Sequence, residues 1–250
     1  MGGEPRLALL SLMLPADFLV SDVDQLLSGF LEMASTARVA VAGGNIARSP
    51  GPLIVDVMVT GAVKPRKVLT RSGGKAGDSL FVTGTIGAAA AGLSCLRTHE
   101  ADRVPAEMRD CARRHRRPEP RLRIGALLGR NRAATACMDL SDGLADAVAQ
   151  IAAASGTGAR LDAASLPIDP AARGWFDAAG ADPVTASLSG GDDYELLFAS
   201  SGRTAGRLRA VLHQTRGVPI TRIGELTANR ALTVTRDGAE SPLPSGFAHF

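Results

Sequence analysis

Two aspartates stand where a short apolar run meets a helical pattern, in the stretch 136–155. Asp139 closes the apolar run, Ser141 is predicted to cap a helix, and Asp142 follows directly. The apolar residues that come next recur at the spacing of a buried helical face: Leu144, Val148 and Ile151. Carboxylates near the N-terminal end of a helix stay ionised and bind divalent cations, which favours a site for metal-bound phosphate. Simple capping is the alternative for Ser141 and Asp142, but a cap does not need Asp139.

A second acidic segment, SGGDDYELLF, lies at residues 189–198. Its glycine pair predicts a turn with Asp192 and Asp193 at the edge. The residues after the turn alternate, and this predicts a strand that presents one side-chain face: Tyr194, Leu196 and Phe198. For Asp192 two interpretations stay open, a substrate contact and a plain turn-forming residue.

The arginine-rich run at residues 109–123 is the other concentration of charge. It lacks interleaved aromatic residues and contains Asp110 and Glu119, so we interpret it as a solvated helical face and expect no nucleic-acid partner. The net charge of +3 permits anionic ligands without demanding them. Three cysteines at wide spacing favour a reducing compartment, and we expect the cytoplasm. No apolar run approaches the roughly 20 residues that span a bilayer, so we expect no membrane partner.

The order of the predicted elements indicates an α+β fold with helices and strands mixed along the chain. The polar, glycine-rich stretch 64–77 is the predicted connection between two domains. The predicted strands cover residues 7–14, 39–42, 53–63, 79–83, 136–139, 159–162, 194–198, 220–226 and 231–235, and the second of them runs into Gly43-Gly44-Asn45. The predicted helices cover residues 17–35, 87–96, 105–116, 121–128, 141–155, 170–179 and 203–214.

Taken together, several segments resemble the thiamine-monophosphate kinase family, within the superfamily of aminoimidazole ribonucleotide synthetase and selenophosphate synthetase. The segments that carry the resemblance are GGNIARSPGP, LTRSGGKAGDSLFVTGTIGAAAAGL, MDLSDGLADAV, LSGGDDYELLFA and the terminal GFAHF. They follow the family's order over nearly the whole chain. The resemblance implies two mixed α/β domains of the aminoimidazole ribonucleotide synthetase-like type, an incomplete N-terminal ATP- and metal-binding domain at residues 1–64 and a C-terminal α/β domain at residues 65–250.

The resemblance also implies roles for individual residues. Asp139, Asp142 and Asn45 would bind Mg²⁺, while Gly44, Asn45, Arg71 and Ser141 would lie along ATP. Asp192 would contact the substrate, and the aromatic ring of Phe247 would pack on its thiamine moiety. The structural alternatives are a surface cation for Arg71 and a core residue on the last strand for Phe247.

Two departures from the family pattern stand out. Asn45 occupies a position where the family commonly has Asp, so a metal site there loses one charge. Nothing in residues 1–35 matches the family's leading segment, which carries metal-binding aspartates and a substrate-contacting histidine. We therefore expect this chain to lack part of the first domain and to be weakly active by itself.

The implied reaction is transfer of the γ-phosphoryl group of ATP to thiamine monophosphate, giving thiamine diphosphate and ADP. The accepting phosphate oxygen is already anionic, so no side chain is assigned as a general base, and positioning with Mg²⁺ carries the chemistry. The resemblance implies a homodimer. The competing hypotheses are another ATP-dependent synthetase of the superfamily and a non-catalytic relative.

Overall fold

The computed structural model describes residues 1–100 and 103–247. The chain divides into two compact units, one formed by Gly3–Arg66 and one formed by Met1–Gly2 together with the chain from Lys67 onward. Along the described residues no helix is both long and apolar enough to cross a membrane.

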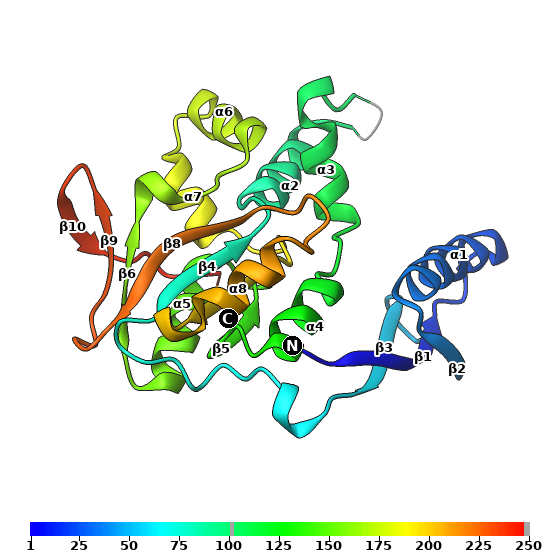
Figure 1. The fold of residues 1–250 in the computed structure, drawn as a ribbon. Helices are drawn as coiled ribbons and strands as arrows, with labels where there is room; N and C mark the ends of the chain where they lie inside the picture. Colours follow the sequence, from blue (N-terminus) through cyan, green and yellow to red (C-terminus); the bar gives the residue numbers. More distant parts are fainter. Residues whose placement is uncertain (101–102, 248–250) are drawn as a thin grey trace. The chain divides into compact units, whose positions relative to one another are not determined.

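The unit Gly3–Arg66 is a small mixed sheet with one long helix (Figure 1). Strand β1 lies in the centre, parallel to β2 on one side and antiparallel to β3 on the other. The elements are β1 (Glu4–Leu14), α1 (Val20–Ala37), β2 (Ala40–Arg48), β3 (Ile54–Ala62) and a 3₁₀ turn at Pro65–Lys67. The strand predicted over residues 39–42 is too short, because β2 continues through Gly43-Gly44-Asn45 to Arg48, and Asn45 pairs with Ser11 of β1.

This unit buries little of its apolar surface. Every residue of β2 and β3 is exposed, although β3 reads IVDVMVTGA. In β1 the residues Ala8, Leu10 and Leu12 are buried, while Leu7 and Leu9, which alternate with them, are exposed. The exposed apolar side chains of β1 and β3 that pair across the strands include Leu9 with Met58 and Met13 with Ile54. Two apolar pairs are therefore exposed on this sheet, and the polar pair Ser11–Asp56 lies between them.

The larger unit is built on a seven-stranded sheet with the order β10-β9-β6-β8-β4-β7-β5. Its strands pair antiparallel except β6 with β9. The strands are β4 (Ser79–Thr83), β5 (Ala136–Asp139), β6 (Gly158–Asp162), β7 (Leu196–Ser200), β8 (Ile220–Thr227), β9 (Leu232–Arg236) and β10 (Ala239–Pro242). The helices are α2 (Ala88–Thr98), α3 (Arg109–Arg116), α4 (Leu122–Asn131), α5 (Leu144–Ser155), α6 (Pro170–Ala178), α7 (Pro183–Ser189) and α8 (Ala205–Leu212).

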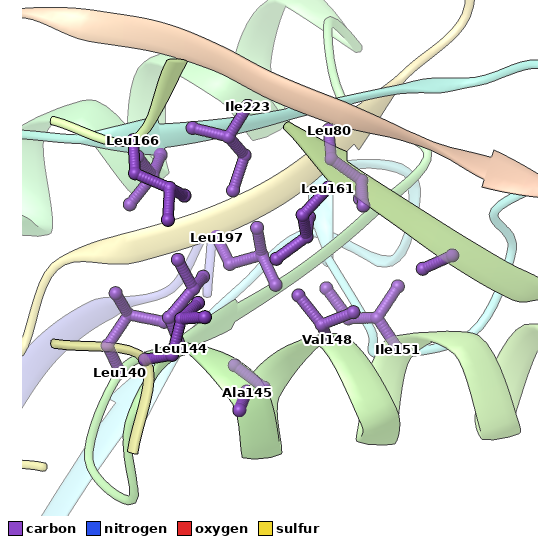
Figure 2. Packing of buried hydrophobic residues seen from close by; sticks show 14 of the residues in the cluster. Leu80, Leu140, Leu144, Ala145, Val148, Ile151, Leu161, Leu166, Leu197 and Ile223 are labelled. Carbon is purple, nitrogen blue, oxygen red and sulfur yellow. The ribbon is translucent and has the colours of Figure 1, made fainter. Parts of the chain in front are cut away.

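Helix α5 packs on one face of this sheet, as the helical spacing predicts. Leu144, Val148 and Ile151 are at most 1% exposed and belong to the main apolar core. Figure 2 shows their side chains pointing toward residues of four strands, which are Leu80, Leu161, Leu197 and Ile223. Burying a side chain of this size contributes about 1.5–3 kcal/mol, so this stripe fixes the helix on the sheet.

Helices α4 and α8 contribute to a second core cluster that uses the alternate residues of the same strands. On β7, Leu197 belongs to the first cluster and Phe198 to the second. On β5, Met138 and Cys137 divide in the same way. Because side chains alternate along a strand, both faces of β5 and β7 are covered, and the end of β5 that carries the acidic motif is held rigidly.

Candidate functional site

The acidic motif at Asp139 lies at the junction of β5 and α5. Strand β5 ends at Asp139, and α5 begins only at Leu144. The residue that caps the helix is Gly143, and no side chain donates or accepts a capping bond there. The prediction that Ser141 caps the helix is therefore wrong. Ser141 and Asp142 instead form a turn before the cap, and their backbone carbonyls accept the amides of Asp192 and Phe247.

Gly143 explains why the turn has this shape. Its φ of 93° belongs to the left-handed region, which strains residues with a Cβ. A Cβ at this position would also lie 2.9 Å from the carbonyl oxygen of Gly190 and 3.0 Å from that of Leu188. The glycine thus lets the β5–α5 turn approach the end of α7 closely.

Backbone hydrogen bonds lock this turn to the second acidic segment. The amide of Asp192 donates to the Ser141 carbonyl at 2.8 Å, and the amide of Tyr194 donates to Leu140 at 3.1 Å. Leu140 in return donates to Glu195 at 2.9 Å. Two motifs separated by about fifty residues in the sequence therefore form one structural element.

The C-terminal segment joins the same element. The Phe247 amide donates to the Asp142 carbonyl at 3.1 Å, and a Cβ on Gly246 would lie 2.5 Å from that of Asp146. Phe247 is 58% exposed and lies outside any strand, so the alternative of a core residue on the last strand is wrong. Residues 248–250 of the predicted GFAHF motif lie outside the described residues.

These segments border a cavity of about 500 Å³, a volume suited to a small-molecule ligand. Helix α2 forms its other wall. The residues that line the cavity are Ala89, Ala90, Leu93, Ser94, Arg97, Thr98, Ser141, Asp142, Gly190, Gly191, Asp192 and Phe247. The structure thus brings together Ser141, Asp142, Asp192 and Phe247 from three separate sequence motifs.

Asp193 faces away from this cavity and fixes helix α2. Its carboxylate accepts hydrogen bonds from the backbone amides of Gly87 at 2.6 Å and Ala89 at 3.1 Å, at the start of α2. Burial raises the pKa of Asp193 to about 6, although the two amides and Arg114 favour its charged form. The side chain ties the acidic segment to the helix that forms the opposite wall.

The buried carboxylate of Glu195 also holds this segment in place. It is 1% exposed and accepts two hydrogen bonds from the Arg121 guanidinium, at 2.6 and 2.7 Å. The Thr83 hydroxyl donates to it at 2.5 Å, and Arg114 lies 3.5 Å away. A fully buried carboxylate is stable only with such partners, so the arginines of the predicted solvated face in fact support the site.

Tyr194 is a site residue that the sequence did not indicate. Its φ is 50° and β7 begins only at Leu196, so the prediction that Tyr194 shares a strand face with Leu196 and Phe198 is wrong. Burial and the neighbouring charges of Asp192, Asp139 and Asp142 raise its pKa. The phenol therefore lies within electrostatic range of these three carboxylates. Only its unusual backbone angle places it there, and no sequence periodicity signals that angle.

The remaining predicted nucleotide residues are distributed over both units. Arg71 is exposed and follows Thr70, whose carbonyl accepts the amide of Cys137 in β5, so the loop of Arg71 runs along that strand. Gly44 and Asn45 lie in β2 of the smaller unit. A Cβ on Gly44 would lie 1.8 Å from the Leu10 carbonyl oxygen, so its lack of a side chain is explained by strand packing.

The oxygen donors of the β5–α5 turn suit a hard divalent cation that is also bound by phosphate and water. Among the described residues no group of three or more His, Cys, Asp or Glu side chains is placed to hold a metal ion by itself. Asp139 ends β5 and Asp142 follows three residues later, before α5 begins, so both carboxylates belong to one short turn. Mg²⁺ typically binds one or two carboxylates together with substrate phosphates and water, and this pair of oxygen donors suits that arrangement.

The cysteines take no part in this site. Cys95, Cys111 and Cys137 are free and buried. Burial raises the pKa of the Cys111 and Cys137 thiols to about 12 and also raises that of Cys95. Because the thiolate is the reactive form, none of the three is an activated nucleophile.

Comparison with known proteins assigns the family. Residues 1–63 match the N-terminal domain of AIR synthase related proteins, and residues 75–237 match the C-terminal domain of the same proteins. The chain is 37% identical over 254 residues to the thiamine-monophosphate kinase of Escherichia coli K12, covering 100% of this chain and 75% of the relative. It is 32% identical over 252 residues to the kinase of Rhodopirellula baltica, covering 71% of that protein. The chain belongs to the thiamine-monophosphate kinase family.

Solved structures of the family support the fold. The structure described as AaThiL complexed with AMPPCP and TMP matches with a TM-score of 0.85 and 30% identity, over 100% of this chain and 75% of that one. Thiamine-monophosphate kinase from Stenotrophomonas maltophilia matches with a TM-score of 0.83 and 31% identity. The predicted α+β fold of the aminoimidazole ribonucleotide synthetase-like type is thereby confirmed.

Proposed function

We propose that the protein phosphorylates thiamine monophosphate with ATP, giving thiamine diphosphate and ADP. The observation that carries the proposal is the joining of the turn 139–142 with the segment 190–195 and Phe247 around one cavity. Relatives that share this fold over 100% of the chain are named thiamine-monophosphate kinases. The enzyme class is that of phosphotransferases with a phosphate group as acceptor.

The chemistry follows from the charge on the acceptor. An anionic oxygen of thiamine monophosphate attacks the γ-phosphorus of ATP, and the bond from that phosphorus to the β,γ-bridging oxygen breaks as ADP leaves. Bound Mg²⁺ would offset the negative charge that the two phosphate groups bring together. The nucleophile carries no proton near neutral pH, so the absence of an assigned base among the site residues agrees with this reaction.

The chain's own residues would hold the reactants. Asp139 and Asp142 would hold Mg²⁺ at the β5–α5 turn, where Ser141 contacts the nucleotide phosphates. Asn45 of β2 would contribute an uncharged oxygen to a metal. Gly44, Asn45 and Arg71 would lie along ATP, and the assignment of nucleotide and metal binding to residues 1–64 is part of this proposal.

The acceptor would occupy the cavity beside α2. Its small apolar wall, Ala89, Ala90 and Leu93, and the exposed ring of Phe247 suit a flat, partly apolar ring system. Asp192 at the rim would pair with the cationic part of thiamine. An aromatic contact of this kind is worth about 0.5–1.5 kcal/mol beyond the buried area.

The proposal includes a homodimer and a cytoplasmic location. The exposed apolar pairs of β1 and β3, Leu9 with Met58 and Met13 with Ile54, support contact with a second copy. The free, buried cysteines support a reducing compartment.

The test is product formation with Mg-ATP and a panel of acceptors. We expect ADP release that depends on thiamine monophosphate, with thiamine diphosphate formed in equal amount. Phe247→Ala should raise KM for thiamine monophosphate more than KM for ATP, while Asp177→Asn, an exposed acid on α6, serves as the control. ADP release driven by another acceptor class, or independent of acceptor, would contradict the proposal.

A further inference from the structure

A histidine outside the predicted site lies against the proposed acceptor acid. Nδ1 of His115, on α3, is 3.7 Å from Oδ2 of Asp192. Nδ1 is buried and, within the described part of the chain, has no hydrogen-bond partner. The His115 side chain is 22% exposed and that of Asp192 46% exposed, so the imidazole is the more buried of the two groups.

The position of His115 is fixed by the residue before it. Arg114 donates to the hydroxyl of Thr85 at 2.5 Å and to its carbonyl at 2.8 Å. It also lies 3.6 Å from Asp169 and 3.5 Å from Glu195. Helix α3 is therefore attached to the segment that contains Asp192, and the imidazole stays where the helix places it.

The backbone of Asp192 is fixed, but its carboxylate has fewer constraints. Its φ of 67° and its amide bond to Ser141 set the start of the side chain. The direction of the carboxylate then depends on the groups beside it, which include His115 and the Tyr194 phenol. A buried imidazole nitrogen without a partner costs free energy unless a bond forms in the working state.

We infer that His115 is a positioning residue for the acceptor, donating its Nδ1 hydrogen to Asp192 and directing that carboxylate into the cavity. At 3.7 Å the contact is longer than a hydrogen bond, and such contacts in ligand-free sites commonly tighten when the substrate binds. The inference rests on the proposed function, because it takes Asp192 as the residue that meets thiamine monophosphate.

The test compares His115→Ala, His115→Asn and His115→Gln with the control Arg116→Ala, an exposed neighbour on α3. Calorimetric titration should show that His115→Ala binds thiamine monophosphate about tenfold more weakly than the wild type, or more weakly still. The loss of a hydrogen bond to a charged group has an effect of this size. Asparagine places its amide near the position of Nδ1 and should restore binding, while glutamine should not. Binding of Mg-AMPPCP should stay unchanged in all of them.

A double-mutant cycle and a spectrum separate the two claims. His115→Ala should cost little in an Asp192→Asn background if the histidine acts through Asp192. In ¹⁵N NMR of the free protein, Asp192→Asn should shift the His115 Nδ1 resonance, and Arg116→Ala should not. If the protein binds no thiamine monophosphate but the resonance shifts, the proposed function fails and the pairing stands. Three results would overturn the inference. They are a His115 Nδ1 resonance that Asp192→Asn does not shift, losses of thiamine monophosphate affinity that add in the double mutant, and equal losses of affinity in His115→Ala and Arg116→Ala.

Discussion

The two units differ in how far they bury their apolar side chains. In the larger unit, β5 and β7 are covered on both faces, and their ends carry the acidic segments at fixed positions. In the unit Gly3–Arg66, β2 and β3 are exposed over their whole length although β3 is as apolar as a core strand. The larger unit therefore determines its part of the site from its own core. The smaller unit exposes apolar side chains of a kind that another protein surface commonly covers.

The largest effect should come from the buried carboxylate of the larger unit. Glu195→Ala leaves Arg121 and Arg114 without their common partner inside the protein. We expect the free energy of unfolding to fall by about 3–5 kcal/mol, as for other broken buried ion pairs. Denaturant unfolding measures it. Glu119→Ala removes an Arg121 partner that is 74% exposed and should change stability little; equal losses in both variants would refute the buried anchor.

The pH dependence of stability should report Asp193. Its pKa is raised by burial from an ordinary value near 4 to about 6, so the folded state holds a proton that the unfolded state has lost between these values. The free energy of unfolding should therefore fall by roughly 3 kcal/mol as the pH rises from about 4 to about 6. Denaturation at a series of pH values measures this slope. Asp193→Asn should flatten it, and an unchanged slope would show that Asp193 is not its source.

A charged substitution tests whether the exposed apolar residues of the smaller unit form the dimer contact. Met58 is 55% exposed on β3 beside Leu9, so Met58→Asp should leave the secondary structure intact and shift the protein from dimer to monomer. Sedimentation velocity over a range of concentrations measures the change. Leu212→Asp alters an apolar residue of the larger unit that is 39% exposed and should not change the mass. A wild-type protein that sediments as a monomer would contradict the proposed dimer.

The smallest effect should be at Ser141. Because α5 begins at Leu144 and is capped by Gly143, Ser141→Ala should change the free energy of unfolding by less than about 0.5 kcal/mol, whereas loss of a true cap costs about 1 kcal/mol. Thermal denaturation distinguishes the two values. A loss near 1 kcal/mol would restore the capping role that the sequence suggested.

The sequence predicted the elements better than their ends. Strand β4 was placed at Ser79–Thr83, and the buried stripe of α5 followed from spacing alone. The short helix α7 was missed because its larger apolar residues, Val184 and Leu188, form only one pair at helical spacing. The strand predicted over residues 39–42 ended too early, because pairing with β1 extends β2 through Gly43–Asn45 although glycine is rare in strands.

The site was predictable where residue type alone signals chemistry. Asp142, Asp192 and Phe247 border one cavity, as the family motifs suggested, but their functional roles stay predictions. Tyr194 and His115 were not found, because one depends on a positive φ and the other on the packing of α3. Such long-range geometry has no local sequence pattern.

The most direct measurement is the metal dependence of nucleotide binding. We expect Asp139→Asn and Asp142→Asn to weaken binding of Mg-AMPPCP about tenfold or more, since each loses a charged oxygen ligand. With EDTA in place of Mg²⁺, both variants should bind the free nucleotide as the wild type does, and Asp177→Asn should match the wild type throughout. Isothermal titration calorimetry gives all of these constants. Equal Mg²⁺ dependence in the wild type and both variants would contradict a metal–phosphate site at the β5–α5 turn.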